Sequence, residues 1–222
     1  MRAGLSLILM LIPAAAVAQT VPTMVDGMIV VPADCAAFVT VQSAGCVVRN
    51  IMHCGPTDNR LMVTARSNDR GMIVGTDDLG LQIVGLEYPE YGWFEMLESA
   101  ADRFDVRIMA ETGADTFDVI ARDNEGVATR TVGERRLTGQ VVMIDNRPLQ
   151  VTQGQYRREP DGMPTETIEE IALYDPTLGI LLLERYFING AAEPAVVSTP
   201  VDFIAAGETG FLSAVPLNGC PE

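Results

Sequence analysis

The residues able to perform acid–base or nucleophilic chemistry are few in this chain of 222 residues. It contains a single histidine, His53, so any Ser-His-Asp or Cys-His arrangement would have to use this imidazole. His53 precedes Cys54, which we expect to be oxidised and therefore unable to act as a nucleophile. No Gly-x-Ser-x-Gly elbow precedes an expected helix. We interpret His53 as a structural or exposed residue.

Carboxylates are abundant, with 30 Asp and Glu residues. Two of them could act as the acid and base of a glycosidase-type hydrolase if the fold brought them together. The residues considered are Glu95, Glu98, Glu169 and Glu170. All four also suit ordinary solvated positions. The acidic segments 77–78 and 123–126 do not match the roughly twelve-residue calcium loop, so we interpret them as turns.

The densest aromatic cluster consists of Tyr88, Tyr91, Trp93 and Phe94. Aromatic side chains between two elements can line the mouth of an apolar pocket or seal one end of a sheet. Both interpretations stay open, and these four are the candidate ligand-binding residues. The methionines are scattered through separate segments and suit core filling better than copper binding. We expect no cofactor and no metal.

The chain has four cysteines: Cys35, Cys46, Cys54 and Cys220. No two of them form a Cys-x-x-Cys motif, so their even number predicts two structural disulfides. Residues 46–54 contain no turn signal, so as a strand they place their ends about 26 Å apart at about 3.3 Å per residue. A disulfide needs Cα atoms within about 7 Å, which makes a Cys46–Cys54 bridge the least favoured. We predict Cys35–Cys46 and Cys54–Cys220.

Residues 1–18 resemble a secretory signal peptide, with Arg2, an apolar run from Leu5 to Ile12 and the small residues Ala16 to Ala18. The apolar run is shorter than the roughly 20 residues needed to span a bilayer. No later segment is apolar enough for a second span, so we expect no integral membrane segment. The expected location is the periplasm or the outside of the cell.

The charge argues against two classes of partner. All 15 basic residues are Arg, and the formal net charge is −15. A surface this acidic repels phosphate backbones and anionic lipid, so we expect neither nucleic-acid binding nor electrostatic membrane attachment.

The elements that must position these residues are mostly strands. Short alternating apolar runs, separated by Gly, Pro, Asn and Asp turns, continue from about residue 46 to residue 205. This pattern predicts a mainly β fold: one curved antiparallel sheet or half-barrel of about ten hairpin-connected strands. The spacing of Leu97, Phe104 and Ile108 predicts one amphipathic helix over about 95–112, although a strand over 104–108 is an alternative.

Three segments follow from this pattern. Residues 1–18 are the cleaved leader, residues 19–45 an N-terminal extension with a short helical turn from Asp34, and residues 46–220 a single antiparallel β domain. No linker interrupts the strand series, which favours one well-packed domain.

Residues 46–220 resemble a family of exported β-rich proteins of Gram-negative bacteria that has no assigned activity. The segments carrying the resemblance are Cys46–Cys54, Thr112–Gly113 with Phe117, Leu137–Gly139, Ile144–Asp145, Pro148–Leu149, Pro200–Phe203, Gly207–Phe211 and Cys220. Asn146 stands where this family usually has Gly. At the level of fold, the expected sheet is similar to the half-barrels of periplasmic lipid and lipoprotein carriers, and no residue is transferred from them.

These observations lead to three candidate functions. The first is a non-catalytic exported protein that binds an apolar or amphiphilic ligand, or a lipidated partner, in the concave face of the sheet. The alternative is a cell-envelope interaction or structural protein without a small-molecule site. The third is a carboxylate-based hydrolase, which requires two converging acids with separated pKa values. An empty or a filled interior distinguishes the first two.

Overall fold

A computed structural model describes residues 22–55, 60–67, 71–78 and 80–220. Thirteen strands form one antiparallel sheet, and each strand from β3 to β14 is hydrogen-bonded to the next one along the chain. A separate hairpin, β1–β2, precedes this sheet. The prediction of a mainly β fold with a curved antiparallel sheet is therefore confirmed. The expected leader at residues 1–18 lies outside the described residues.

The strands have the following bounds: β1 Thr23–Val25, β2 Met28–Val30, β3 Cys35–Ser43, β4 Val47–Cys54, β5 Arg60–Ser67, β6 Gly71–Asp78, β7 Ile83–Tyr88, β8 Trp93–Asp102, β9 Ala114–Asp123, β10 Ala128–Ile144, β11 Arg147–Pro160, β12 Glu166–Asp175, β13 Ile180–Ile188, β14 Val196–Val197 and β15 Pro200–Ala205. The described helices are a 3-10 turn, η1 (Pro89–Tyr91), and one α-helix, α1 (Val106–Thr112).

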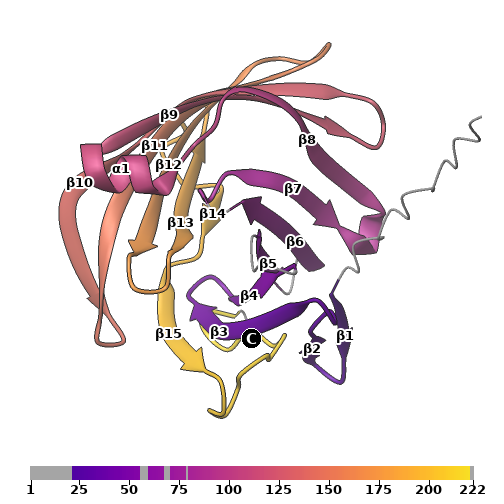
Figure 1. The fold of residues 1–222 in the computed structure, drawn as a ribbon, viewed down its shortest axis with the longest axis vertical. Helices are drawn as coiled ribbons and strands as arrows, with labels where there is room; N and C mark the ends of the chain where they lie inside the picture. Colours follow the sequence, from indigo (N-terminus) through magenta and orange to yellow (C-terminus); the bar gives the residue numbers. More distant parts are fainter. Residues whose placement is uncertain (1–21, 56–59, 68–70, 79, 221–222) are drawn as a thin grey trace, which may run out of the picture.

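The sheet curls strongly, but its edge strands β14 and β15 are not paired with each other, so it is not closed. In Figure 1, β8 to β11 arch over β3 to β6. The edge strands β14 and β15 are separated along the chain by Ser198 and Thr199 alone, so the chain steps from one edge directly to the other. The Ala44 amide donates to the Thr199 carbonyl at 2.8 Å, which joins the β3–β4 turn to this step. The sheet is thus larger and more strongly curled than the expected half-barrel of about ten strands.

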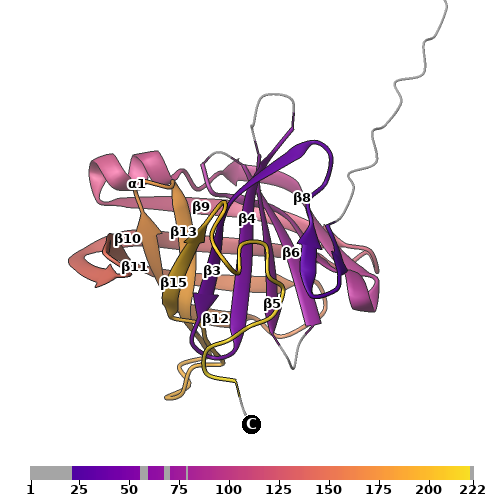
Figure 2. The same ribbon diagram turned by 90° about the horizontal axis from the view of Figure 1, so that it is seen from below.

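Strand β4 is buried on both faces. Its residues show almost no alternation of burial, whereas β6 alternates regularly between buried and half-buried positions. The reason is an outer cover, in which the C-terminal segment crosses β3, β4 and β5 (Figure 2). Gln42 and Asn50 donate to the carbonyls of Val215 and Ser213 at 3.1 and 2.9 Å. The outer face of this half of the sheet is therefore core.

The predicted helix over 95–112 is wrong in its first half and right in its second. Trp93–Asp102 forms β8, which pairs with both β7 and β9. The helix spans only Val106–Thr112; the Asp105 side chain accepts from the Arg107 amide at 2.8 Å, and Gly113 ends the helix at φ 93°. The sequence of β8 fits both a helical spacing of three and four residues and a strand alternation of two residues. It forms a strand because its backbone is hydrogen-bonded to β7 and β9.

The predicted disulfide pairs are also wrong, because Cys35 lies in a strand and not on a helical turn. The observed bridges are Cys35–Cys54 and Cys46–Cys220. Strands β3 and β4 form a hairpin whose register places Cys35 opposite Cys54, with Cα atoms 4.0 Å apart. The sheet accordingly begins at Cys35, within the expected N-terminal extension 19–45, and the expected helical turn at Asp34 is not formed.

Candidate functional site

The curled sheet surrounds a cavity of about 1140 Å³. Pockets that bind small molecules typically measure about 300–1,000 Å³, so this space is large enough for such a ligand. Its wall is built from the inward-facing side chains of the strands and is predominantly apolar. Examples from six strands are Val63, Ile73, Leu97, Phe117, Ala172 and Leu181. The interior of the fold is therefore hollow along part of its length.

The predicted aromatic cluster lies at one end of this cavity. Tyr88, Tyr91 and Trp93 line it, while Phe94 points elsewhere and is 43% exposed. Tyr88 and Trp93 make an edge-to-face contact with ring centroids 5.3 Å apart. Tyr91 is 67% exposed, so the cavity reaches the surface here. We call Tyr88, Tyr91 and Trp93 the aromatic mouth.

The opposite end is closed by the segments around α1. Leu81, Gln82 and Phe104 line the cavity there and are buried. The Gln82 side-chain oxygen accepts from the Phe104 amide at 3.1 Å, and the Val106 amide donates to the Gly80 carbonyl at 2.8 Å. We call this the inner end.

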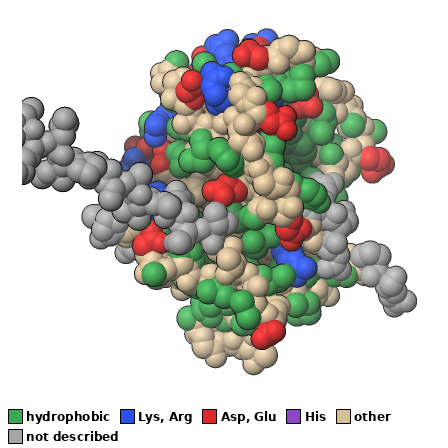
Figure 3. Space-filling view, turned by 90° about the vertical axis from the view of Figure 1, so that its right-hand side faces the viewer, with side chains coloured by type: hydrophobic (Ala, Val, Ile, Leu, Met, Phe, Trp, Pro, Cys, Tyr) green, Lys and Arg blue, Asp and Glu red, His purple; other side chains and the backbone are tan. Residues whose placement is uncertain are grey.

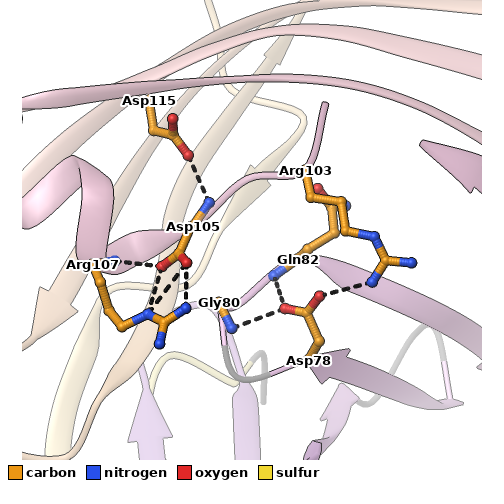
Figure 4. Close-up of polar contacts among 7 residues, drawn as sticks. All are labelled: Asp78, Gly80, Gln82, Arg103, Asp105, Arg107 and Asp115. Atoms are coloured by element: carbon orange, nitrogen blue, oxygen red, sulfur yellow. Dashed lines mark hydrogen bonds and ion pairs between the residues drawn. The ribbon is translucent and has the colours of Figure 1, made fainter. Parts of the chain in front are cut away.

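Two carboxylates stabilise the closure of the inner end (Figure 4). Asp78 accepts from the amides of Gly80 and Gln82 at 2.9 and 3.1 Å and from Arg103 at 3.2 Å. Asp115 accepts from the Asp105 amide at 2.6 Å, which fixes the start of α1. The β6–β7 turn and the start of α1 are therefore held by side chains as well as by backbone bonds.

Asp77 lines the inner end from β6. Burial, with Asp78 as a lesser cause and Arg135 acting in the opposite direction, raises the pKa of Asp77 to about 7. Near neutral pH, its carboxyl is thus present in both protonation states. The sequence analysis interpreted this acid as part of a solvated turn, and its place in the cavity wall follows only from the fold.

An ion pair in the same cavity wall is close enough to influence the pKa of Asp77. Arg135 on β10 and Glu170 on β12 are bonded to each other, although β11 lies between their strands. The residue between them on β11 is Gly154, which is opposite both in register. A Cβ atom at Gly154 would lie 2.8 Å from Cγ of Glu170. Glycine therefore leaves the space through which the two charged side chains meet.

A second glycine, Gly133, leaves the space in which two aromatic rings meet across a strand. Gly133 on β10 is opposite Phe117 on β9 and Tyr156 on β11. The two rings contact each other across it, with centroids 5.7 Å apart. The Tyr156 hydroxyl donates to Glu170 at 2.9 Å, and burial together with Glu170 raises the pKa of Tyr156 well above its ordinary value.

Arg49 lines the cavity near the step between the sheet edges. Its guanidinium donates to Ser43 Oγ at 3.0 Å, to Ser198 Oγ at 2.8 Å and to the Leu183 carbonyl at 3.3 Å. Burial lowers the pKa of Arg49 to about 10, so it stays charged at neutral pH. Arg49 thus connects β4 to β13 and to the residue after β14.

A weaker pair lies nearer the aromatic mouth. Glu95 and Arg158 both line the cavity, and their charged atoms are 3.9 Å apart. Burial raises the pKa of Glu95, with Arg158 opposing the shift. The wall therefore combines an apolar surface with a few charged side chains at defined positions.

The other candidate residues are not brought together. Glu98 is paired with Arg122 of β9 at 2.9 Å. Glu169 and Glu170 are consecutive on β12, so their side chains lie on opposite faces of the sheet. The His53 ring stacks on Phe38 with centroids 4.6 Å apart, while Cys54 is bonded to Cys35. No group of three or more His, Cys, Asp or Glu side chains in the described part of the chain is placed to hold a metal ion.

Sequence reasoning missed Asp77 and Arg135 as members of the cavity wall. The usable signal was the pair of glycines inside long strands, Gly133 and Gly154, because glycine within a strand often marks a close approach. It was not sufficient, since the strand register was needed to show what meets across each glycine.

No helix among the described residues is long and apolar enough to cross a membrane. Comparisons of the chain with protein-family models, with curated proteins and with solved structures find no match.

Proposed function

We propose that this chain is a non-catalytic exported protein that binds an apolar or amphiphilic ligand inside its curled sheet. The observation that carries the proposal is the cavity of about 1140 Å³ with its largely apolar wall. Protein interiors are normally packed as densely as organic crystals, and empty space lined by apolar groups costs stability. A cavity of this size therefore favours a protein that holds something over one that only provides a surface.

The aromatic mouth supports the same proposal. Tyr88 and Trp93 offer large apolar faces where the cavity reaches the surface, while the inner end is closed. An amphiphile can enter such a space with its chain against the apolar wall. A lipidated partner could insert its acyl chain in the same way.

The location belongs to the proposal as well. Two disulfides are typical of an oxidising compartment, and residues 1–18 have the pattern of a secretory leader. We therefore place the protein in the periplasm or outside the cell. The resemblance to exported β-rich proteins agrees with this location and adds no ligand.

Native mass spectrometry of protein purified from its natural compartment tests the proposal. We expect a fraction of the molecules to carry an additional mass that organic solvent extracts. A uniformly ligand-free spectrum would contradict it.

A substitution that fills the cavity provides a second test. Gly75 lines the cavity, and the nearest atom to a Cβ there is the Val63 carbonyl oxygen at 3.9 Å. Gly75→Phe should therefore place its ring in the cavity and abolish retention of the ligand mass. Val141→Phe, in the exposed part of the β10–β11 hairpin, is the control that should retain it.

A specific observation favours the alternative function, an envelope protein that acts through its surface. Met24, Val25, Met28 and Val30 of the β1–β2 hairpin are large apolar residues, all exposed. Hydrophobic side chains also lie between acidic and basic ones on the face drawn in Figure 3. If a partner docks on the hairpin, Val25→Asp should remove a cross-link to that partner in intact cells and leave the ligand mass unchanged.

The hydrolase hypothesis gains no support from the geometry. The carboxylate of Asp78 is bonded within the β6–β7 turn, and Glu170 is paired with Arg135. Neither carboxylate is therefore free to act with Asp77 as an acid–base pair, and we do not propose hydrolysis.

A further inference from the structure

The carboxyl of Asp77 is the feature of the cavity that the proposed function leaves unexplained. It lines the inner end, and no hydrogen bond or ion pair joins it to any residue of the described chain. Asp77 is half-buried, and a polar group withdrawn from water normally has a hydrogen-bond partner, because an unmade hydrogen bond costs free energy there. An ionised carboxylate without a partner is costlier still.

The bases near Asp77 are engaged elsewhere. Arg103 is bonded to Asp78, and Arg60, at the same end of β5, is paired with Asp34 at 3.4 Å. Across the cavity, Arg135 is bonded to Glu170. None of these guanidinium groups lies within ion-pair distance of Asp77.

The remaining titratable groups packed around β6 are placed differently. These are Arg66 on β5, Glu87 on β7, which is opposite Val74 in register, Glu90 in η1, and His53 on β4, one strand beyond β5. Arg66 donates to the Ala214 carbonyl on the outer side at 3.2 Å, and Glu90 contacts Gly71 at the other end of β6. His53 is separated from Asp77 in the sheet by Leu61.

We propose that the amphiphile held in the cavity is cationic, with an ammonium head group that binds the carboxylate of Asp77 at the inner end while its chain extends toward the aromatic mouth. This inference rests on the proposed function and names the chemical class of its ligand. A charge-assisted hydrogen bond from an ammonium group would supply the partner that Asp77 lacks.

Two further observations favour a cation over an anion. The formal net charge of −15 attracts cations to the molecule and repels anions. The inner end already accommodates a cation against an aromatic face, since the Arg135 guanidinium lies 5.0 Å from the centre of the Phe104 ring. Arg49 is a cavity-lining cation without an acid partner in the described chain, but its guanidinium already donates to three neutral oxygens that hold the sheet edges together.

The test compares three probes with the same chain and different head groups: dodecylamine, dodecanoic acid and 1-dodecanol. Their binding to the full mature protein is followed by displacement of the apolar dye N-phenyl-1-naphthylamine and by fluorescence of Trp93, the single tryptophan of the chain. At pH 8, we expect dodecylamine to bind at least about tenfold more tightly than dodecanoic acid.

Asp77→Asn is the decisive variant. It should weaken the binding of dodecylamine by about tenfold or more and change that of 1-dodecanol less than about twofold. Asp118→Asn is the matched control, because this acid pairs with Arg130 at 2.6 Å on the outer face and should leave all three affinities unchanged.

The pH dependence provides an independent readout. With a pKa of about 7, Asp77 should lose its charge between pH 8 and pH 6, and dodecylamine affinity should fall about tenfold over that interval. Asp77→Asn should abolish this dependence.

The possible failures are distinguishable. If none of the three probes binds and the dye is not taken up, the proposed function is wrong and this inference falls with it. If 1-dodecanol binds but dodecanoic acid binds as well as or better than dodecylamine, or Asp77→Asn changes nothing, the cavity remains a binding site and the cationic head group is refuted.

Discussion

Asp77 destabilises the empty protein at neutral pH. Its pKa is raised to about 7 in the folded chain, whereas an unfolded aspartate titrates near about 3.9. Between these two values the folded state holds a proton that the unfolded state has lost. Stability contributed by this site is therefore full at low pH and falls as the pH rises toward 7. A cationic ligand bound to Asp77, as proposed, would offset this cost in the complex.

Asp77→Asn should accordingly stabilise the ligand-free protein at pH 8, by up to about 4 kcal/mol. The gain should shrink as the pH is lowered and disappear below about pH 3, where the wild-type residue is protonated in both the folded and the unfolded state. Urea unfolding at a series of pH values measures the difference. An equal stability of the two proteins at pH 8 would contradict the raised pKa of Asp77.

At the scale of elements, the glycines inside strands decide which side chains meet across the sheet. A Cβ at Gly133 would lie 2.3 Å from both the Gln155 carbonyl oxygen and Cβ of Tyr156. Neither atom is the end of a flexible side chain, so β10 and β11 would have to move apart. Gly75 on β6 has open space at the same position, with its nearest atom 3.9 Å away.

Gly133→Ala and Gly75→Ala therefore form a matched pair of substitutions. We expect Gly133→Ala to destabilise the fold by about 1–3 kcal/mol, because crowding of this kind forces the backbone to shift. Gly75→Ala should be neutral or stabilising by about 0.4–1 kcal/mol, because it reduces the freedom of the unfolded chain. Denaturant unfolding compares the two, and the reverse order would contradict the register of β10 and β11.

At the scale of the whole molecule, the C-terminal segment closes the outer layer. It runs over β3, β4 and β5 and ends at the disulfide between Cys220 and Cys46 (Figure 2). This bridge joins residues separated by 174 positions, whereas Cys35–Cys54 joins positions 19 apart within one hairpin. The Cys46–Cys220 bridge therefore constrains most of the unfolded chain.

Replacing Cys46 and Cys220 together by alanine should destabilise the protein more than replacing Cys35 and Cys54. In the chain-entropy description the losses are about 5 and about 3 kcal/mol, respectively. Thermal and urea unfolding of the two double variants measure them under oxidising conditions. A larger loss for the shorter loop would mean that local contacts in the β3–β4 hairpin outweigh chain entropy.

Local patterns were sufficient for hairpins and insufficient where two periodicities overlap. Asp145 and Asn146, between β10 and β11, both adopt positive φ, as a tight two-residue hairpin requires. Asp and Asn favour this conformation, so the turn could be predicted from the sequence. The segment 95–112 satisfies both a helical and a strand spacing, and only pairing with β7 and β9 resolved it. The cysteine pairs were mispredicted for the same reason, because the register of β3 and β4 was unknown.

Composition and turn residues by themselves determined a mainly β chain of antiparallel strands with two disulfides, since these depend on residue type and short spacing. Only the tertiary structure decided that the sheet curls around a hollow interior and that Asp77, Arg135 and Glu170 face it together. These residues come from β6, β10 and β12, and no local rule relates strands so far apart in sequence. Their approach depends on curvature and register, which are properties of the whole sheet.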